Sequence, residues 1–198
     1  RIMRAICFVL LLASAAGADW RQWRGFSRNG LASHKVDLEK LPAELTADWN
    51  VEIGTGYAAP IVSGTRVFTF SRQKGREVVQ AFDRATGKPR WEKTDLTWGM
   101  QHDCELLPNG NFLLFANGQD TGLPPASRVI ELDPATGKTV WEYKGDPPWT
   151  FFSPHISGVQ RLCSGNTLIC EGNWGRIFEV TPQKEIVWEY ISPFFGKH

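Results

Sequence analysis

Two histidines and three arginines are the side chains of this sequence best suited to chemistry. His102 and His155 each stand shortly before a copy of the same glycine-containing turn motif, so they occupy nearly equivalent places in an internal repeat. A neutral imidazole nitrogen is a competent nucleophile near neutral pH. The guanidinium groups of Arg128, Arg161 and Arg176 match the geometry of an oxyanion. The competing interpretation is structural, with hydrogen-bonded or surface histidines and with arginines in salt bridges between repeats.

The elements that must position these residues follow from a repeat that ends in tryptophan. The segment at 82–91 (FDRATGKPRW) recurs at 132–141 (LDPATGKTVW) and, more loosely, at 180–188 (VTPQKEIVW). Aspartate accepts hydrogen bonds from the amides of such a turn, and glycine supplies a position with positive φ. The tryptophans that end the units lie 42, 50 and 47 residues apart, at Trp49, Trp91, Trp141 and Trp188. Periods of this size are typical of β-propeller blades, and the fixed indole predicts a wedge between neighbouring blades.

A second repeat precedes the first one within each unit. Residues 106–114 (LLPNGNFLL) match residues 161–169 (RLCSGNTLI), and Asn-Gly between apolar runs is the strongest short signal for a β-hairpin. The sequence therefore predicts an all-β fold of about four four-stranded antiparallel β-propeller blades. Propellers usually have roughly 4–8 blades. Because the first methionine is Met3 and only about four units are present, we expect an incomplete propeller that is part of a larger one.

The N-terminal residues have the features of a secretory signal peptide. Residues 1–18 combine Arg4, an apolar run at 5–13 that is too short to span a bilayer, and an A-x-A-like end at 16–18. We expect cleavage before Asp19 and export to the periplasm or the extracellular space. No later segment is long and apolar enough to span a membrane, and a net charge of +1 gives no electrostatic footprint for nucleic acid.

Three cysteines follow the signal segment, at Cys104, Cys163 and Cys170. An odd number excludes complete pairing within the chain, and the absence of C-x-x-C spacing argues against a zinc site. Two of the three can pair in an oxidising compartment, although the sequence does not say which two. The default expectation is that they fill small buried positions in strands.

Four motifs in the first half of the chain carry a family resemblance. They lie at 19–25 (DWRQWRG), 28–30 (RNG), 56–62 (GYAAPIV) and 82–88 (FDRATGK). On these motifs, residues 19–94 resemble the pyrroloquinoline-quinone-like (PQQ-like) propeller proteins of bacteria, a group that includes outer-membrane assembly lipoproteins, and blades of this kind are expected over residues 19–97. The resemblance implies a non-catalytic propeller that acts as a binding or assembly scaffold for other proteins of the cell envelope.

The second half of the chain carries a different set of motifs. They lie, in consistent order, at 101–103 (QHD), 107–111 (LPNGN), 127–131 (SRVIE), 160–162 (QRL), 165–168 (GNTL) and 175–180 (GRIFEV). On these motifs, residues 98–196 resemble the arylsulfate sulfotransferases, which are also propellers, and blades of this kind are expected over residues 98–198. The two halves are expected either to form one continuous propeller or to come from a join in the gene model.

The second resemblance implies an activity without cofactor or metal. A sulfuryl group would pass from a phenolic sulfate ester to another phenol, independently of PAPS, through a sulfated histidine. His102, or His155 in the next blade, would be the sulfuryl acceptor, and Arg128, Arg161 and Arg176 would hold the sulfate. The sequence departs from the family pattern after His102, where Asp103 and Cys104 replace His-x-Asn, and at 115–118 (FANG), where the family has an arginine.

Three classes of function therefore remain after the sequence is read. The main hypothesis is an exported arylsulfotransferase-like propeller, and the alternative is the envelope scaffold. A quinone-dependent dehydrogenase ranks last, because the sequence contains no calcium-binding cluster of acidic and amide residues. Convergence of the two histidines with the arginines around one pocket would favour the sulfotransferase.

Overall fold

The structure is a computed structural model that describes residues 19–31, 37–40, 42–44, 46–56, 58–95, 98–119 and 121–194. The signal-peptide prediction for residues 1–18 lies outside these residues. Within them, three four-stranded antiparallel sheets follow one another along the chain. Helical structure in the described residues is limited to short 3-10 turns: η2 (Leu38–Lys40), η3 (Pro148–Thr150) and η4 (Gly172–Trp174). None of the described helices is long and apolar enough to cross a membrane.

Each sheet is one propeller blade, and its strands are paired in the order in which they occur in the sequence. Blade 1 contains β1 (Ile61–Ser63), β2 (Arg66–Gln73), β3 (Arg76–Asp83) and β4 (Pro89–Asp95). Blade 2 contains β5 (Gln101–Leu106), β6 (Phe112–Ala116), β7 (Arg128–Asp133) and β8 (Lys138–Lys144). Blade 3 contains β9 (Ser157–Arg161), β10 (Thr167–Glu171), β11 (Arg176–Val180) and β12 (Ile186–Ile191).

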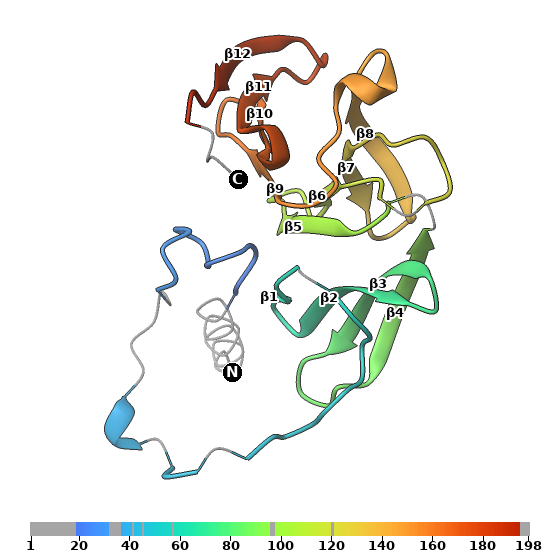
Figure 1. The fold of residues 1–198 in the computed structure, drawn as a ribbon. Helices are drawn as coiled ribbons and strands as arrows, with labels where there is room; N and C mark the ends of the chain where they lie inside the picture. The colour runs from blue at the N-terminus through green and yellow to red at the C-terminus, as the bar shows by residue number, and fades with distance from the viewer. Residues whose placement is uncertain are drawn as a thin grey trace, which may run out of the picture.

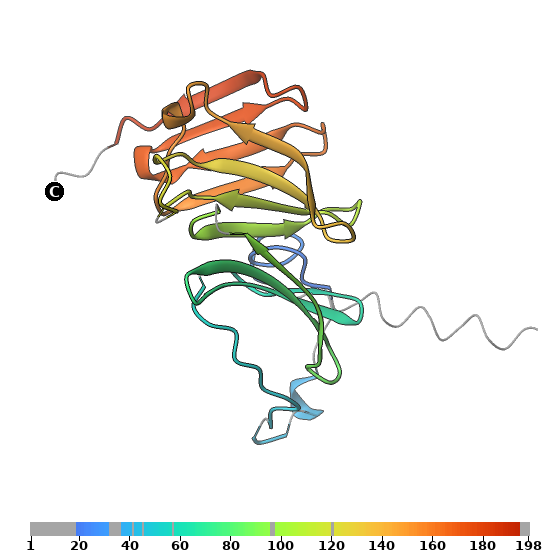
Figure 2. The same ribbon diagram turned by 90° about the vertical axis from the view of Figure 1, so that its right-hand side faces the viewer.

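The three blades are arranged around a common centre, with the first strand of each blade innermost. β1, β5 and β9 lie toward the middle in Figure 1, and Figure 2 shows the sheets stacked along the chain. The predicted all-β fold of four-stranded antiparallel blades is thereby confirmed. The described residues contain three complete blades where about four were predicted, and the described residues before blade 1 pair with it through two isolated bridges, Trp20 with Val62 and Thr55 with Arg72.

Strand β6 lies between two hydrophobic cores, one on each side of blade 2. All five of its residues are buried, because each face of the strand contacts a different neighbouring blade. Side chains alternate between the two faces of a strand. Phe112 and Leu114 therefore join the hydrophobic core between blades 1 and 2, whereas Leu113 and Phe115 join the core between blades 2 and 3. A continuous apolar run is thus the expected pattern for a strand in the middle of a propeller.

Consecutive units of the repeat are connected where the tryptophan of one unit contacts the turn of the next. Asp83 accepts hydrogen bonds from the backbone N–H groups of Ala85 and Thr86 inside its turn. Gly87 has a φ of +67°, and a Cβ at this position would come within 2.7 Å of the ring of Trp49. Trp49 Nε1 donates to the carbonyl oxygen of Arg84 at 2.8 Å, so the indole of the preceding unit docks on the turn of blade 1.

The segment at 19–31 runs across the inner strands of the blades. Trp20 forms an antiparallel bridge with Val62 of β1, and the carbonyl oxygen of Arg21 accepts a hydrogen bond from the backbone N–H of Leu106 at the end of β5. The DWRQWRG motif therefore supplies backbone partners to inner strand edges. Nearby, Arg28 Nη2 donates to the carbonyl oxygen of Val159 in the middle of β9 at 3.3 Å.

Candidate functional site

A cavity of about 750 Å³ lies where the segment at 19–31 meets the starts of β5 and β9. We call it the inner cavity. Apolar side chains form much of its wall, among them Trp23, Ala58, Ala59, Met100 and Ile156. Its polar residues are Arg28, His102, Asp103, His155 and Ser157. An apolar cleft with a few converging polar groups is the usual form of a ligand site.

His102 lies on β5 and is held from behind by Asn117, which follows β6. His102 Nδ1 and Asn117 Oδ1 are 2.8 Å apart. Asn117 Nδ2 donates to the carbonyl oxygen of Ser153 at 2.7 Å, so the amide oxygen is the atom that faces the imidazole. His102 therefore carries a hydrogen on Nδ1, and in the neutral ring the lone pair is on Nε2.

His155 reaches the same cavity from the loop that precedes β9. The loop is fixed by the buried Ser153, whose hydroxyl donates to the carbonyl oxygens of His155 and Ile156 at 2.8 and 2.9 Å. His155 itself is exposed. The two histidines selected from the sequence thus line one cavity, His102 from within β5 and His155 from the loop before β9.

A buried acid–base group forms one side of the inner cavity. Asp103 Oδ2 accepts a hydrogen bond from the backbone N–H of Val159 at 2.9 Å and lies 3.7 Å from Arg28 Nη1. Arg28 Nη2 is 3.0 Å from Glu105 Oε2. Burial raises the pKa of both Asp103 and Glu105 above the ordinary carboxyl value, and the Arg28 charge opposes that rise. Both carboxylates therefore form ion pairs with the same guanidinium group, that of Arg28.

Four residues around the inner cavity have backbone conformations that non-glycine residues seldom adopt. Arg28, Met100, Asp103 and Ile156 have φ values of 52°, 61°, 43° and 59°. Left-handed conformations cost energy in residues with a Cβ and concentrate at functional sites. Their clustering around one cavity supports its assignment as the functional site. No feature of the sequence indicated these conformations.

The three arginines selected from the sequence lie outside the inner cavity. Arg128 pairs with Glu142 at 2.9 Å within blade 2, and Arg176 pairs with Glu171 and Glu189 at 3.3 and 2.6 Å within blade 3. Arg161 bridges the two blades, with Nη2 2.7 Å from Glu131 Oε2 and its guanidinium 5.0 Å from the ring of Trp141. All three arginines form salt bridges, and that of Arg161 joins two blades as the competing interpretation describes.

Sequence reasoning did not select Arg28, which lines the inner cavity, or Asn117, which holds His102 from behind. Arg28 belongs to the RNG motif that carried the first resemblance. Asn117 stands in the segment where the sulfotransferase pattern led us to expect an arginine. It is completely buried, and a buried amide must find hydrogen-bond partners, which it does in His102 and Ser153.

The three cysteines in the described part of the chain are unpaired thiols. Cys104 and Cys170 line the inner cavity, whereas Cys163 is exposed. Burial raises the pKa of both cavity thiols, which keeps them protonated and poorly nucleophilic. Within the described part of the chain, no group of three or more histidine, cysteine or acidic residues could hold a metal ion.

Consecutive four-stranded blades with tryptophan-docked turns and a cavity at the inner strands define a β-propeller of the PQQ-like class. The family model described as outer membrane protein assembly factor BamB matches residues 20–192, and the chain belongs to this family. The match spans both halves of the chain, and nothing in the comparisons supports the arylsulfotransferase resemblance of the second half. No curated protein matches the sequence significantly.

Solved structures of low sequence identity are similar to parts of the chain. One is a protein of unknown function from Bacteroides caccae, with 16% identity, a TM-score of 0.43 and 64% of this chain covered. Another is BamB from Moraxella catarrhalis, with 21% identity, a TM-score of 0.39 and 65% covered. A third is a europium-containing methanol dehydrogenase, with 18% identity, a TM-score of 0.38 and 70% covered. The chain spans 42%, 34% and 25% of the lengths of these three proteins, respectively.

Proposed function

We propose that the protein is a non-catalytic PQQ-like propeller that binds a partner in the cell envelope and serves as a binding or assembly scaffold. The observation that carries the proposal is the charge balance of the inner cavity. Among the described residues that line it, Arg28 is the only lysine or arginine, and it is shared by Asp103 and Glu105. A site that transfers an anionic group needs fixed positive charge or hydrogen-bond donors for that group. Here the positive charge is already neutralised.

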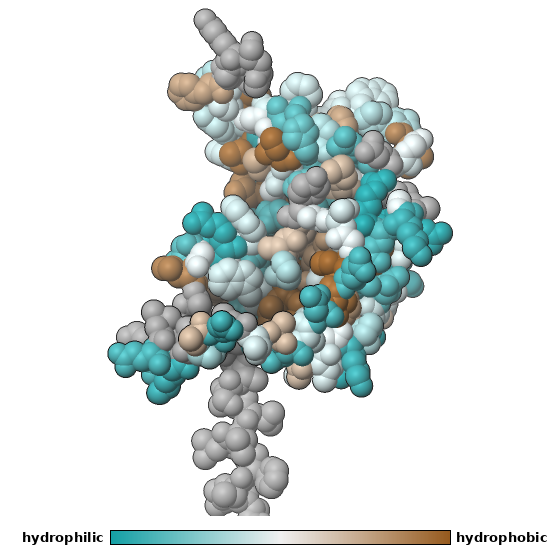
Figure 3. All heavy atoms as spheres, turned by 60° about the horizontal axis from the view of Figure 1, so that its bottom comes forward, coloured by the Kyte–Doolittle hydropathy of each residue, from teal (hydrophilic) through white to brown (hydrophobic). Residues whose placement is uncertain are grey.

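The apolar part of the cavity suits an extended polypeptide. Trp23 and Ile156 at the cavity are 57% and 61% exposed, although both are large hydrophobic residues. Exposed apolar groups framed by polar ones are typical of interaction sites, and Figure 3 shows hydrophobic residues in groups between hydrophilic ones on one face of the molecule. The family description, an assembly factor for outer membrane proteins, supports a partner with alternating apolar residues, because transmembrane β-strands have that pattern.

The location in the envelope is part of the same proposal. The predicted signal peptide at 1–18 and the family description both support export, to the periplasm or the extracellular space. Other envelope proteins are then the available partners.

A binding experiment tests the scaffold. A fluorescent ten-residue peptide with alternating aromatic and polar residues is titrated with the purified protein, and its anisotropy is recorded. We expect saturable binding that is lost in Ala59→Trp, which fills the inner cavity, and retained in Val140→Trp, which adds the same side chain to an exposed position on β8. The same affinity in all three proteins, or no binding by folded protein, would count against the proposal.

Sulfuryl transfer is the second candidate, and the state of His102 favours it. With the hydrogen on Nδ1, the Nε2 lone pair of a neutral ring can attack the sulfur of an aryl sulfate, and the phenolate leaves and takes up a proton. An acceptor phenol would then take the sulfuryl group from the imidazole. Release of phenol from a chromogenic aryl sulfate, abolished in His102→Ala with His155→Ala, would place this candidate first. No release by the folded chain would remove it for this polypeptide.

A further inference from the structure

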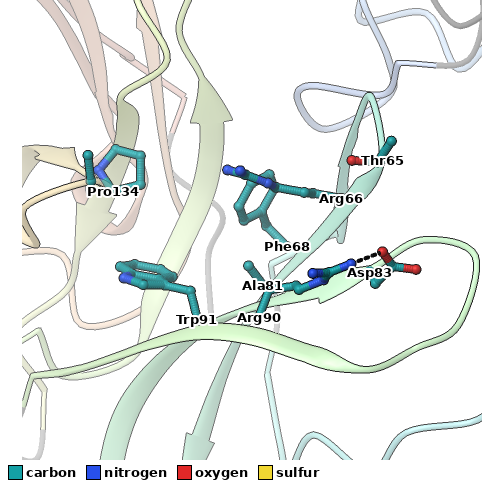
Figure 4. Close-up of a pocket in the computed structure, with 9 residues that line it drawn as sticks. Thr65, Arg66, Phe68, Ala81, Asp83, Arg90, Trp91 and Pro134 are labelled. Atoms are coloured by element: carbon teal, nitrogen blue, oxygen red, sulfur yellow. Dashed lines mark hydrogen bonds and ion pairs between the residues drawn. The ribbon is translucent and has the colours of Figure 1, made fainter.

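A second cavity, of about 560 Å³, opens between blades 1 and 2, away from the inner cavity. We call it the junction cleft. Its floor contains Phe68 from β2 and Ala81 from β3, both buried, and Trp91 of β4 packs partly buried against the same core. Pro134 in the β7–β8 turn closes the opposite side (Figure 4).

The junction cleft is the place where a repeated hydrogen bond is not formed. Trp49 Nε1 donates to the carbonyl oxygen of Arg84 at 2.8 Å, and Trp141 Nε1 donates to that of Pro182 at 2.9 Å. In the repeat, Trp91 corresponds to these tryptophans, and Pro134 corresponds to the two acceptors. Yet Trp91 Nε1 has no hydrogen-bond acceptor anywhere in the described residues. An indole N–H that is satisfied at two junctions is thus left open to a ligand at the third.

Of the two arginines at the junction cleft, one has no partner among the described residues. Arg90 Nη2 is 2.6 Å from Asp83 Oδ2, and this bond contributes most to lowering the pKa of Asp83 to about 2. Asp83 is therefore ionised and neutralises Arg90. Arg66 forms neither an ion pair nor a hydrogen bond with the described residues, and Figure 4 shows its guanidinium extended past Phe68 into the cleft. The cleft thus carries one uncompensated positive charge beside an aromatic floor.

We propose that the junction cleft binds a carboxylate carried on an aromatic or other apolar body. The guanidinium of Arg66 can form two parallel hydrogen bonds with the carboxylate. The apolar body packs between Phe68 and Trp91, and an oxygen of the ligand accepts the hydrogen bond of Trp91 Nε1. The volume lies within the roughly 300–1,000 Å³ of small-ligand sites. The site is separate from the inner cavity, so it goes beyond the proposed scaffold function.

A pair of probes that differ only in charge tests this proposal. The protein is titrated with 3-phenylpropanoate and with the neutral 3-phenylpropanamide, and the indole N–H signal of Trp91 is followed by NMR, assigned through Trp91→Phe. We expect the acid to shift the Trp91 signal and to bind about tenfold more tightly than the amide. Arg66→Gln should weaken binding of the acid about tenfold, whereas Arg76→Gln, an exposed arginine of blade 1 that does not line the cleft, should leave it unchanged.

Three results would overturn the proposal: equal affinity for acid and amide, equal affinity in Arg66→Gln and Arg76→Gln, or no shift of the Trp91 signal. Thermal unfolding of each variant confirms that the fold is retained. The peptide acetyl-Phe-Glu-amide distinguishes the two sources of the carboxylate. If it binds as tightly as the free acid, the cleft takes an acidic side chain of a polypeptide, and if it binds tenfold more weakly, the cleft takes a small free acid.

Discussion

Asn117 connects the imidazole of His102 to the neighbouring blade. Its amide oxygen lies 2.8 Å from His102 Nδ1 in blade 2, while its amide nitrogen donates to the carbonyl oxygen of Ser153 at 2.7 Å and to Ser157 Oγ at 3.3 Å. Ser153 in turn holds the loop that carries His155. One buried amide therefore sets the tautomer of the first histidine and the position of the second.

Replacement of Asn117 should affect both stability and the histidine. In Asn117→Ala the carbonyl oxygen of Ser153 loses a buried donor, so the free energy of unfolding should fall by about 1–3 kcal/mol. The neutral His102 ring should also lose its exclusive Nδ1–H form, because the acceptor is gone. Urea denaturation measures the first effect and ¹⁵N NMR of the imidazole the second. Asn29→Ala, at an exposed position, is the control, and an unchanged tautomer in Asn117→Ala would contradict the assignment.

The blades were predictable because their signals are local. The Asp83 turn satisfies its own amides and needs its glycine for positive φ, and both features are visible within six residues of sequence. The salt bridge of Arg161 was not predictable in this way. Its partner Glu131 lies 30 residues earlier and meets it only because blades 2 and 3 pack face to face. The same holds for Asn117, whose partners come from β5 and from the loop before β9.

One sequence signal could have assigned Glu131 a structural role. Glu131 accepts from Asn109 and Asn111 of the hairpin turn, and Glu179 accepts from Asn166 at the corresponding place in blade 3. A glutamate two residues before the tryptophan-ended turn thus recurs together with an asparagine directly after the glycine of the hairpin turn. This pairing indicates a structural role for Glu131 and for Arg161, which forms a salt bridge with it.

Strand β6 should be highly sensitive to truncation. Phe112 is fully buried, and its ring packs edge-on against Phe68 and Phe70 of blade 1, with centroid distances of 4.8 and 5.5 Å. Phe112→Ala should lower the free energy of unfolding by about 3–5 kcal/mol, because it leaves a cavity between two blades. Phe26→Ala, which removes a ring that is 82% exposed, should change it by less than about 0.5 kcal/mol. Equal losses in urea denaturation would contradict the packing described for β6.

The docked and undocked tryptophans offer a matched comparison. Trp141 donates to the carbonyl oxygen of Pro182 and stacks with Arg161, whereas Trp188 on β12 is 49% exposed and donates no hydrogen bond to the described residues. Trp141→Phe should cost about 1–2 kcal/mol of unfolding free energy, since it removes a hydrogen bond and weakens the cation–π contact. Trp188→Phe should cost less than about 0.5 kcal/mol. Thermal unfolding separates the two, and a larger effect at Trp188 would show that the docking bond stabilises little.

The Asp83 turn should make stability depend on pH in the acid range. The pKa of Asp83 is lowered from 3.8 to about 2, chiefly by the hydrogen bond from Arg90. The folded state therefore binds this proton less tightly than the unfolded state. The contribution of Asp83 is fully present above about pH 4 and is lost as the pH falls through about 2. Burial raises the pKa of Asp103 and Glu105, so their contributions change in the opposite sense.

Urea denaturation between pH 2 and 5 isolates the contribution of Asp83, because the variants differ by one side chain. In Asp83→Asn the free energy of unfolding should be lower than in the unmodified protein at pH 5, and the difference should shrink toward pH 2. Arg90→Gln, which removes the main cause of the low pKa, should reproduce part of the effect. Asp48→Asn removes an exposed carboxyl outside the repeated turns and serves as the control. A pH-independent difference for Asp83→Asn would mean that the turn gains nothing from the charge, and the amide hydrogen bonds alone would then hold it.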